Sequence, residues 1–112
     1  LADAMLDCVR ETQESGIPYF LVGHVGDGNF HIGYLIDPAI PQEVETAERL
    51  NRQLVQRALD LGGTCTGEHG VGLHKIDFLE AEAGPQALAM MRAIKQALDP
   101  HNIMNPGKVL AV

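Results

Sequence analysis

The spacing of hydrophobic and polar residues predicts four helices along the chain. Apolar positions recur every three or four residues, as expected for helices that bury one face, over residues 1–15, 41–61, 73–82 and 85–98. The second segment shows the clearest pattern, because Pro41 is a typical first helical residue and Gly62-Gly63 is a typical end. Between the first two helices the pattern changes, so a different element is expected there.

In that interval, the sequence predicts a β-hairpin. Residues 17–22 and 32–36 are rich in β-branched and aromatic side chains, which favour strands. Both faces of these strands are apolar, so both need a covering layer, and two strands alone form a marginal sheet. The order of elements predicts an α+β fold with a small antiparallel sheet packed with helices. We expect a fragment of a larger domain, whose other strands, or a second copy of this chain, complete the sheet.

The turn of this hairpin carries the first candidate for chemistry. We expect Gly26-Asp27-Gly28-Asn29 to form a four-residue loop. Asp27 and Asn29 are either further candidates for the site or, as we expect, turn residues. His24 then lies directly opposite His31, and side chains paired in this way have Cβ atoms roughly 4.5–5.5 Å apart. Two imidazoles at that separation can share one metal ion.

A second glycine-rich segment, Gly67-Glu68-His69-Gly70, offers a carboxylate and a third imidazole. His24, His31 and Glu68 form a ligand set that suits zinc, iron, manganese or cobalt, and three protein ligands leave one coordination position open. Residues 64–72 are expected to form a short strand or a loop. If the segment is extended, neighbouring side chains point to opposite faces, so we expect His69 to act as an acid or base beside the metal. The alternative for His69 is a structural role, bonded to backbone in a tight turn.

Composition narrows the function classes. The chain has 112 residues, enough for one domain or part of one, and its net charge of −7 argues against binding nucleic acid. No apolar run approaches the roughly 20 residues of a transmembrane helix. Only Cys8 and Cys65 are present, which favours a reducing, cytoplasmic compartment over a disulfide framework. Cys65 is either a group that approaches the metal or, as we expect, a small buried hydrophobe.

Three motifs resemble those of one enzyme family. Gly23–His31 resembles a GHxGDGNxH signature, Gly63–Gly72 resembles a GTCTGEHGxG signature, and the segment from Asp99 to Lys108 resembles a terminal LDPxxxxNPGK. All three are typical of the C-terminal domain of FAD-linked oxidases of the vanillyl-alcohol oxidase type, and here they occur in family order. Within that family the resemblance points to D-lactate dehydrogenases, the glycolate oxidase FAD subunit and D-2-hydroxyglutarate dehydrogenase.

The resemblance implies a flavoenzyme that oxidises a D-2-hydroxy acid to a 2-oxo acid. By motif position, His24, His31 and Glu68 would hold a divalent zinc, manganese or iron ion, which would polarise the substrate hydroxyl. His69 would take the hydroxyl proton while the C2 hydrogen leaves as hydride to the flavin, and Asn105 would lie near that flavin. FAD itself would be bound mainly by a domain absent from this chain.

One position departs from the pattern of the hydroxyglutarate enzymes. In those enzymes a polar Asn stands two residues after the second metal histidine and contacts the substrate, whereas this chain has Gly33. The departure favours a smaller acid such as lactate or glycolate. Residues 1–112 would form the C-terminal part of a substrate-binding, or cap, domain that needs the rest of the parent flavoenzyme.

The start of the chain supports the same expectation. It begins with Leu1 within a helical pattern and shows no signal peptide, so we expect it to be excised from a longer protein. The isolated fragment is therefore predicted to be inactive, and the full-length enzyme to be cytoplasmic, with peripheral membrane association as an option. Two other function classes stay open at this point: a stand-alone metal-binding or regulatory module without catalysis, and a metal-dependent hydrolase in which Glu68 or His69 activates water.

Overall fold

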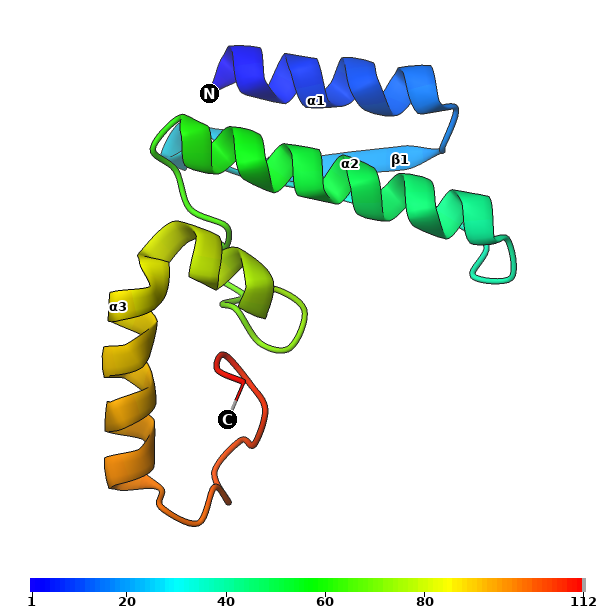
Figure 1. Cartoon of the computed structure of the whole chain (residues 1–112). Helices are drawn as coiled ribbons and strands as arrows, with labels where there is room; N and C mark the ends of the chain where they lie inside the picture. The colour runs from blue at the N-terminus through cyan, green and yellow to red at the C-terminus, as the bar shows by residue number, and fades with distance from the viewer. Residues whose placement is uncertain (112) are drawn as a thin grey trace. The chain divides into compact units, whose positions relative to one another are not determined.

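The computed structural model describes residues 1–111, which form two compact units, residues 1–61 and 62–111. The first unit contains helix α1 (Ala2–Ser15), strand β1 (Tyr19–His24), a short 3₁₀ turn η1 (Val25–Asp27), strand β2 (Asn29–Tyr34) and helix α2 (Pro41–Asp60). Helices α1 and α2 lie side by side (Figure 1). The second unit contains helix α3 (Ile76–Leu98). The predicted α+β class, with one small antiparallel sheet, is confirmed.

The two helices of the first unit begin and end where the sequence predicts. Helix α1 stops at Gly16, which has φ 75° and donates its N–H to the Gln13 carbonyl at 3.1 Å. Glycine adopts this left-handed conformation without the steric cost that a Cβ imposes. Helix α2 has Pro41 in its first turn, where the missing N–H would be unsatisfied in any case.

Helix α3 combines the two helices predicted for the C-terminal half. It starts at Ile76, three residues later than the predicted Leu73, and kinks at Gly84, which has φ 78° and ψ 166°. Pro85 follows, and its ring and missing N–H prevent the helix from continuing straight through this point. The predicted break at Gly84 is therefore confirmed as a kink between two helical segments.

The hairpin forms, but its predicted register is wrong. His24 pairs with Asn29, and His31 pairs with Val22, so the two histidines do not face each other directly. The loop comprises residues 25–28 because Gly28, at φ 78°, provides the left-handed residue that closes the turn. Asn29 therefore lies outside the turn and is the first residue of β2.

Within the described structure, β1 is more exposed on one face of the hairpin than on the other. Tyr19 and Leu21 are half-buried while Phe20 and Val22 are about half exposed, as expected where helices cover one face. Tyr19 accepts a hydrogen bond from Gln13 of α1 at 3.1 Å, which fixes the covered face against that helix. The most buried side chains of this unit are Cys8, Thr12, Ile17, Ala47, Leu50 and Val55.

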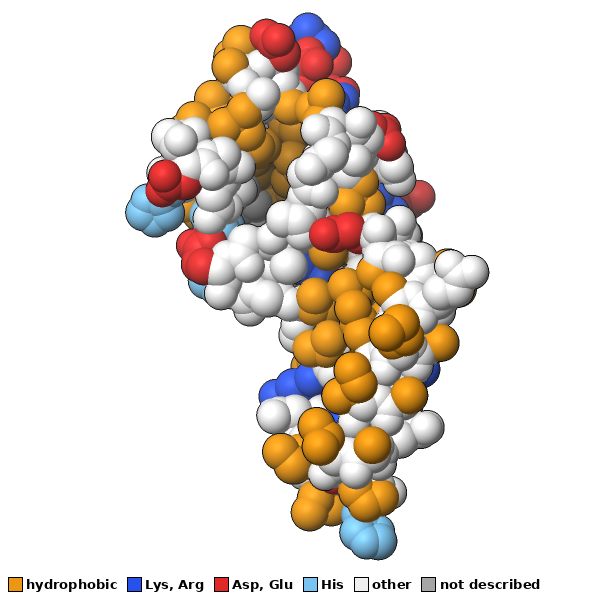
Figure 2. All heavy atoms as spheres, turned by 90° about the vertical axis from the view of Figure 1, so that its left-hand side faces the viewer, with side chains coloured by type: hydrophobic (Ala, Val, Ile, Leu, Met, Phe, Trp, Pro, Cys, Tyr) orange, Lys and Arg blue, Asp and Glu red, His pale blue; other side chains and the backbone are white. Residues whose placement is uncertain are grey.

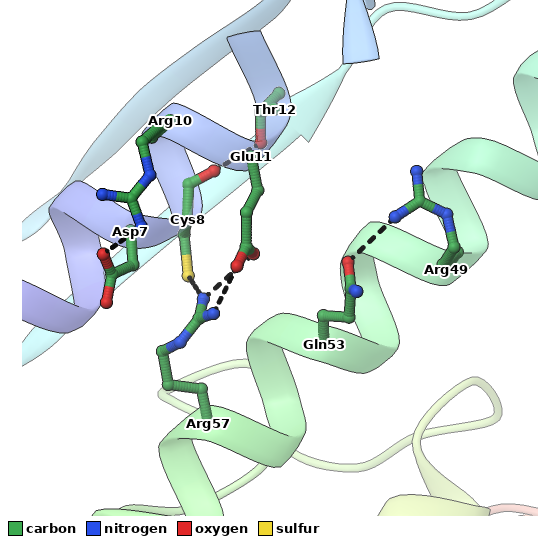
Figure 3. Close-up of polar contacts among 8 residues, drawn as sticks. All are labelled: Asp7, Cys8, Arg10, Glu11, Thr12, Arg49, Gln53 and Arg57. Atoms are coloured by element: carbon green, nitrogen blue, oxygen red, sulfur yellow. Dashed lines mark hydrogen bonds and ion pairs between the residues drawn. The ribbon is translucent and has the colours of Figure 1, made fainter. Parts of the chain in front are cut away.

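A polar bridge joins the two helices of the first unit (Figure 3). Arg57 of α2 donates from Nη1 to Glu11 at 3.1 Å and to the Cys8 sulfur at 3.1 Å, and from Nη2 to the second Glu11 oxygen. The bond from Arg57 lowers the pKa of Glu11, whereas burial raises the pKa of Cys8. The bridge therefore holds α1 against α2, with Cys8 as a protonated thiol.

The second unit has a smaller apolar core. Its buried hydrophobic side chains are Cys65, Leu88 and Leu110. By contrast, Met90, Ile94 and Leu98 lie four residues apart on α3 and are 59–77% exposed. Figure 2 shows hydrophobic side chains gathered along this helix. Within residues 1–111, each helix falls short of the combined length and apolarity needed to cross a lipid bilayer.

Candidate metal and catalytic site

The first half of the predicted ligand set lies on the exposed face of the hairpin. His24 is opposite Asn29, and His31 is two residues further along β2, so both histidines project from the same face in a diagonal relation. Diagonal neighbours are roughly 7–8 Å apart, which long side chains can still bridge. His24 is exposed and His31 is half-buried. The corrected register therefore weakens the close pairing of the imidazoles but keeps them on one surface.

Asn29, which the sequence predicted to lie in the turn, is on the same face as the two histidines. Asn29 stands directly opposite His24 and is partly buried, with its amide on the histidine face. Its strand position could have been found from Gly28, because glycine is a better left-handed residue than Asn. Asn29 is thus a polar neighbour of the candidate ligands rather than a turn residue.

Close backbone packing fixes the hairpin at this point. A Cβ at Gly23 would lie 2.5 Å from the Asn29 carbonyl oxygen and 2.5 Å from the Phe30 Cα, closer than real Cβ contacts. Gly23 pairs with Phe30, next to the pair that contains His24. The glycine that opens the first motif is therefore required by the approach of the two strands, not only by access of a substrate.

Gly33, which lies on the histidine face, is covered by an aromatic ring. Phe20 is paired with Gly33, and a Cβ at Gly33 would lie 2.1 Å from the tip of the Phe20 ring. Phe20 thus occupies the space that a side chain at position 33 would take. This arrangement explains how the chain accommodates a glycine in an otherwise apolar strand.

The second half of the predicted set lies on a turn in the other unit. The Gly70 N–H donates to the Gly67 carbonyl at 3.2 Å, which places Glu68 and His69 at the tip of the turn. Their side chains approach to 3.9 Å between Glu68 Oε1 and His69 Nε2, and they are 51% and 75% exposed. The premise of an extended segment is therefore wrong, because a tight turn does not alternate its side chains as a strand does. The base role of His69 now rests on the family motif.

Cys65 is a buried hydrophobe in this structure. The residue is 6% exposed, and burial is the main cause that raises the pKa of its thiol to about 11. Of the two roles considered for Cys65, the packing role is the one that its surroundings favour.

Asn105 lies in the C-terminal segment, which is organised by Asp99. The Asp99 carboxylate is buried, receives hydrogen bonds from the Ile103 and Met104 N–H groups at 3.0 and 2.9 Å, and pairs with Lys95. The Lys95 contact is the main cause that lowers the pKa of Asp99. Asn105 itself is exposed and has φ 47°, a left-handed conformation that Asn tolerates better than most residues.

The predicted site residues are thus divided between the two units. His24 and His31 belong to the first, and Glu68, His69 and Asn105 to the second. The donors, two imidazole nitrogens and one carboxylate oxygen, fit a divalent metal of the zinc, manganese or iron class. Their assembly into one site stays a prediction.

Comparison with known proteins gives a family match over nearly the whole chain. Residues 1–109 match the model for the C-terminal domain of FAD linked oxidases. A mitochondrial D-lactate dehydrogenase (cytochrome) of Arabidopsis thaliana is 46% identical over 110 residues, which cover 98% of this chain and 19% of the relative. The glycolate oxidase subunit GlcD of Bacillus subtilis is 44% identical over 89 residues, covering 80% of this chain and 19% of the relative.

A third relative extends the range of substrates named. A D-2-hydroxyglutarate dehydrogenase of Xanthomonas citri pv. viticola is 39% identical over 89 residues, covering 78% of this chain and 19% of the relative. The chain therefore spans 19% of the length of each of these relatives. The names of all three refer to oxidation of a 2-hydroxy acid.

Proposed function

The chain belongs to the family of FAD-linked oxidase C-terminal domains, and from this premise we propose that it forms part of the substrate domain of an FAD-dependent D-2-hydroxy-acid dehydrogenase. The observation that carries the proposal is the family match over residues 1–109, together with relatives whose names share one substrate class. All 2-hydroxy acids share a hydroxyl group on the carbon next to a carboxylate. A site for it must bind both groups and accept one proton and one hydride.

The chain's own residues have distinct roles in this proposal. His24, His31 and Glu68 hold a divalent ion, and His69 accepts the proton of the substrate hydroxyl, a task suited to an imidazole near neutral pH. When bound, the ion supplies Lewis-acid polarisation of the hydroxyl, and FAD supplies the hydride acceptor. His69 is exposed at the tip of its turn, which leaves its imidazole accessible to a small substrate.

We favour lactate or glycolate as the substrate within this class. The support is the Phe20 ring, which fills the space above Gly33 on the histidine face. A polar side chain at position 33, able to contact a second carboxylate, would have to displace that ring. The proposed specificity is therefore for a short side chain on the hydroxy acid.

The rest of the parent flavoenzyme is the proposed partner of this chain, and it would bind most of the FAD, with Asn105 close to the flavin. Two uncovered apolar surfaces support this proposal: the histidine face with Phe20, Val22 and Leu35, and the α3 stripe with Met90, Ile94 and Leu98. Exposed apolar groups of this size mark surfaces that another part of a protein covers. We therefore expect the isolated chain to lack dehydrogenase activity.

The compartment is a separate part of the proposal. The relative from Arabidopsis thaliana is named as mitochondrial, as is one from Saccharomyces cerevisiae. The cytoplasmic compartment predicted from the two free cysteines stays a prediction. Fractionation of cells that express the full-length enzyme, with detection of this domain by antibody, checks it directly.

The proposal is tested with the full-length enzyme, numbered as here. We expect oxidation of D-lactate or glycolate with a dye acceptor, and bound metal by elemental analysis in wild type. His24→Ala and His31→Ala should each lose the metal, whereas His101→Ala, an exposed histidine outside the predicted site, should keep it. Equal metal content in all variants, or hydrolysis of esters without any need for FAD, would reject this function in favour of a structural hairpin or a hydrolase.

A further inference from the structure

The loop that carries Glu68 and His69 has little structure of its own. Residues 63–72 contain no helix or strand, and four of them are glycine. Glycine-rich backbone has many accessible conformations, so contacts from outside the loop must select one. A side chain of α3 makes such contacts.

One carboxylate holds the start of this loop. Glu82 of α3 accepts hydrogen bonds through Oε2 from the Cys65 N–H at 2.8 Å and from the Thr64 hydroxyl at 3.0 Å. Bonds to an ionised acceptor are stronger than those to a neutral one, and the Cys65 N–H is the main cause that lowers the pKa of Glu82.

The position of Glu82 within its helix supports a role in the loop. The residue lies two positions before the kink at Gly84, at the C-terminal end of the first segment of α3. Free carbonyl groups at a helix C-terminus disfavour a carboxylate there. The two loop donors, the Thr64 hydroxyl and the Cys65 N–H, offset this cost, so the side chain serves the loop and not the helix.

Other contacts hold the remainder of the loop. The Val109 N–H donates to the Gly72 carbonyl at 2.7 Å, and Val109 has φ 68°, a conformation unfavourable for a β-branched residue. Lys75 Nζ lies 3.4 Å from the Thr66 hydroxyl. The loop is therefore tied at both ends, with the Gly67–Gly70 turn between the ties.

We propose that Glu82 is a positioning residue that, by fixing Thr64 and Cys65, sets where the turn presents Glu68 and His69. Its consequence for catalysis rests on the proposed function, whereas the anchoring of the loop does not. Gln at position 82 keeps a carbonyl oxygen at the same reach, and Ala removes the acceptor. The two substitutions therefore separate loss of the contact from loss of the charge.

The anchoring is measured by hydrogen–deuterium exchange of the peptide covering residues 63–72 in the full-length enzyme. In Glu82→Ala we expect exchange to rise about 10-fold, and in Glu82→Gln by a much smaller factor. Glu80→Ala is the matched control, an exposed glutamate on the same helix, and should leave exchange unchanged. Thr64→Val removes one donor without altering α3 and should give a smaller rise, which keeps the test available if Glu82→Ala folds poorly. Unchanged exchange in Glu82→Ala would overturn the inference.

The effect on the site is measured on the same samples. We expect metal affinity and kcat with D-lactate to fall about 10–100-fold in Glu82→Ala, with substantial rescue in Glu82→Gln. An active, metal-loaded wild type together with unchanged kcat and metal content in Glu82→Ala would overturn the positioning role. A wild type that neither binds metal nor oxidises a 2-hydroxy acid would instead reject the proposed function and with it the catalytic consequence, while the exchange result still decides the anchoring.

Discussion

The two units of this chain position their candidate site residues in different ways. In the first unit, His24 and His31 stand on paired strands, so the main-chain hydrogen bonds of the hairpin fix their spacing. In the second unit, Glu68 and His69 stand on a glycine-rich turn that is tied to α3 by the side chain of Glu82. The first arrangement depends on backbone geometry and the second on a few polar side chains. Substitutions should therefore act on them differently.

The two units also differ in the side chains that they bury. Small and apolar side chains of α1, α2 and the segment before β1 are buried in the first unit, whereas the second, within the described residues, buries Cys65, Leu88, Leu110 and the carboxylate of Asp99. Buried apolar area is the main source of folding free energy, at about 25 cal/mol per Å². We expect the stability of the chain to respond mostly to the first unit, and the catalytic activity of the full-length enzyme to respond to both.

The largest expected effect is a loss of catalytic activity when His69, in the exposed Gly67–Gly70 turn, is substituted. His69→Gln in the full-length enzyme should lower kcat about 10²- to 10⁴-fold, since the proposed proton acceptor is lost. The side chain is 75% exposed, so the melting temperature should stay the same. His74→Gln, an exposed histidine in the adjacent segment, serves as the control and should change neither quantity. A kcat within a factor of three of wild type would remove His69 from the mechanism.

The next effect is on stability through the core of the first unit. Leu50 is 3% exposed, and Leu50→Ala should lower the free energy of unfolding by about 2–5 kcal/mol because it leaves a cavity. Leu61, which is 66% exposed, is the matched leucine, and Leu61→Ala should stay within about 0.5 kcal/mol of wild type. Urea denaturation followed by circular dichroism gives both values. Equal losses in the two variants would contradict the core described here.

A smaller effect tests the dependence of the histidines on backbone geometry. Gly23→Ala should lower the free energy of unfolding by about 1–3 kcal/mol, because the added Cβ meets the backbone of β2 at 2.5 Å. The control is Gly26→Ala in the same hairpin, where the added Cβ meets nothing within 4 Å. Thermal denaturation of the three proteins provides the comparison. If Gly26→Ala proved the more damaging variant, the strand register would be in error.

The smallest effect concerns the Arg57–Glu11 bridge and depends on pH. Because Arg57 lowers the pKa of Glu11 below its ordinary value of 4.5, the bridge stabilises the folded state above that pH. The contribution is lost as the pH falls through the lower folded pKa. Glu11→Gln should therefore reduce the free energy of unfolding by about 1 kcal/mol at pH 7 and by much less at pH 3. A difference from wild type that grows towards acid pH would show the opposite sign and contradict the bridge.

Much of the fold could be predicted from the sequence because its signals are local. Apolar periodicity together with Gly16, Pro41 and Gly84 marked where helices begin, end or kink, and the structure agrees at each of these positions. These residues act through their own φ, ψ and missing atoms, which do not depend on the rest of the chain. The family match likewise follows from motifs that are contiguous in sequence.

The hairpin register shows where local signals were insufficient. The histidines were placed on one face correctly, since strand periodicity is two, but the loop comprises residues 25–28 and not the expected 26–29, which changes the partner of His24 from His31 to Asn29. The conformation of the Glu68-His69 segment, a short strand or a loop by its sequence, was left open for a related reason. Its composition did not distinguish an extended strand from the tight turn that the structure shows.

By itself, the sequence determined the helices, the existence of the hairpin, the family and the residues proposed to hold a metal and move a proton. The tertiary structure alone decided the pairing of His24 with Asn29, the ring of Phe20 over Gly33 and the contact of Glu82 with Cys65. The physical reason is that two of these contacts join residues from separate parts of the chain, and the pairing of His24 depends on which residues form the turn. They depend on how strands and helices pack, and neither hydrophobic periodicity nor a contiguous motif predicts them.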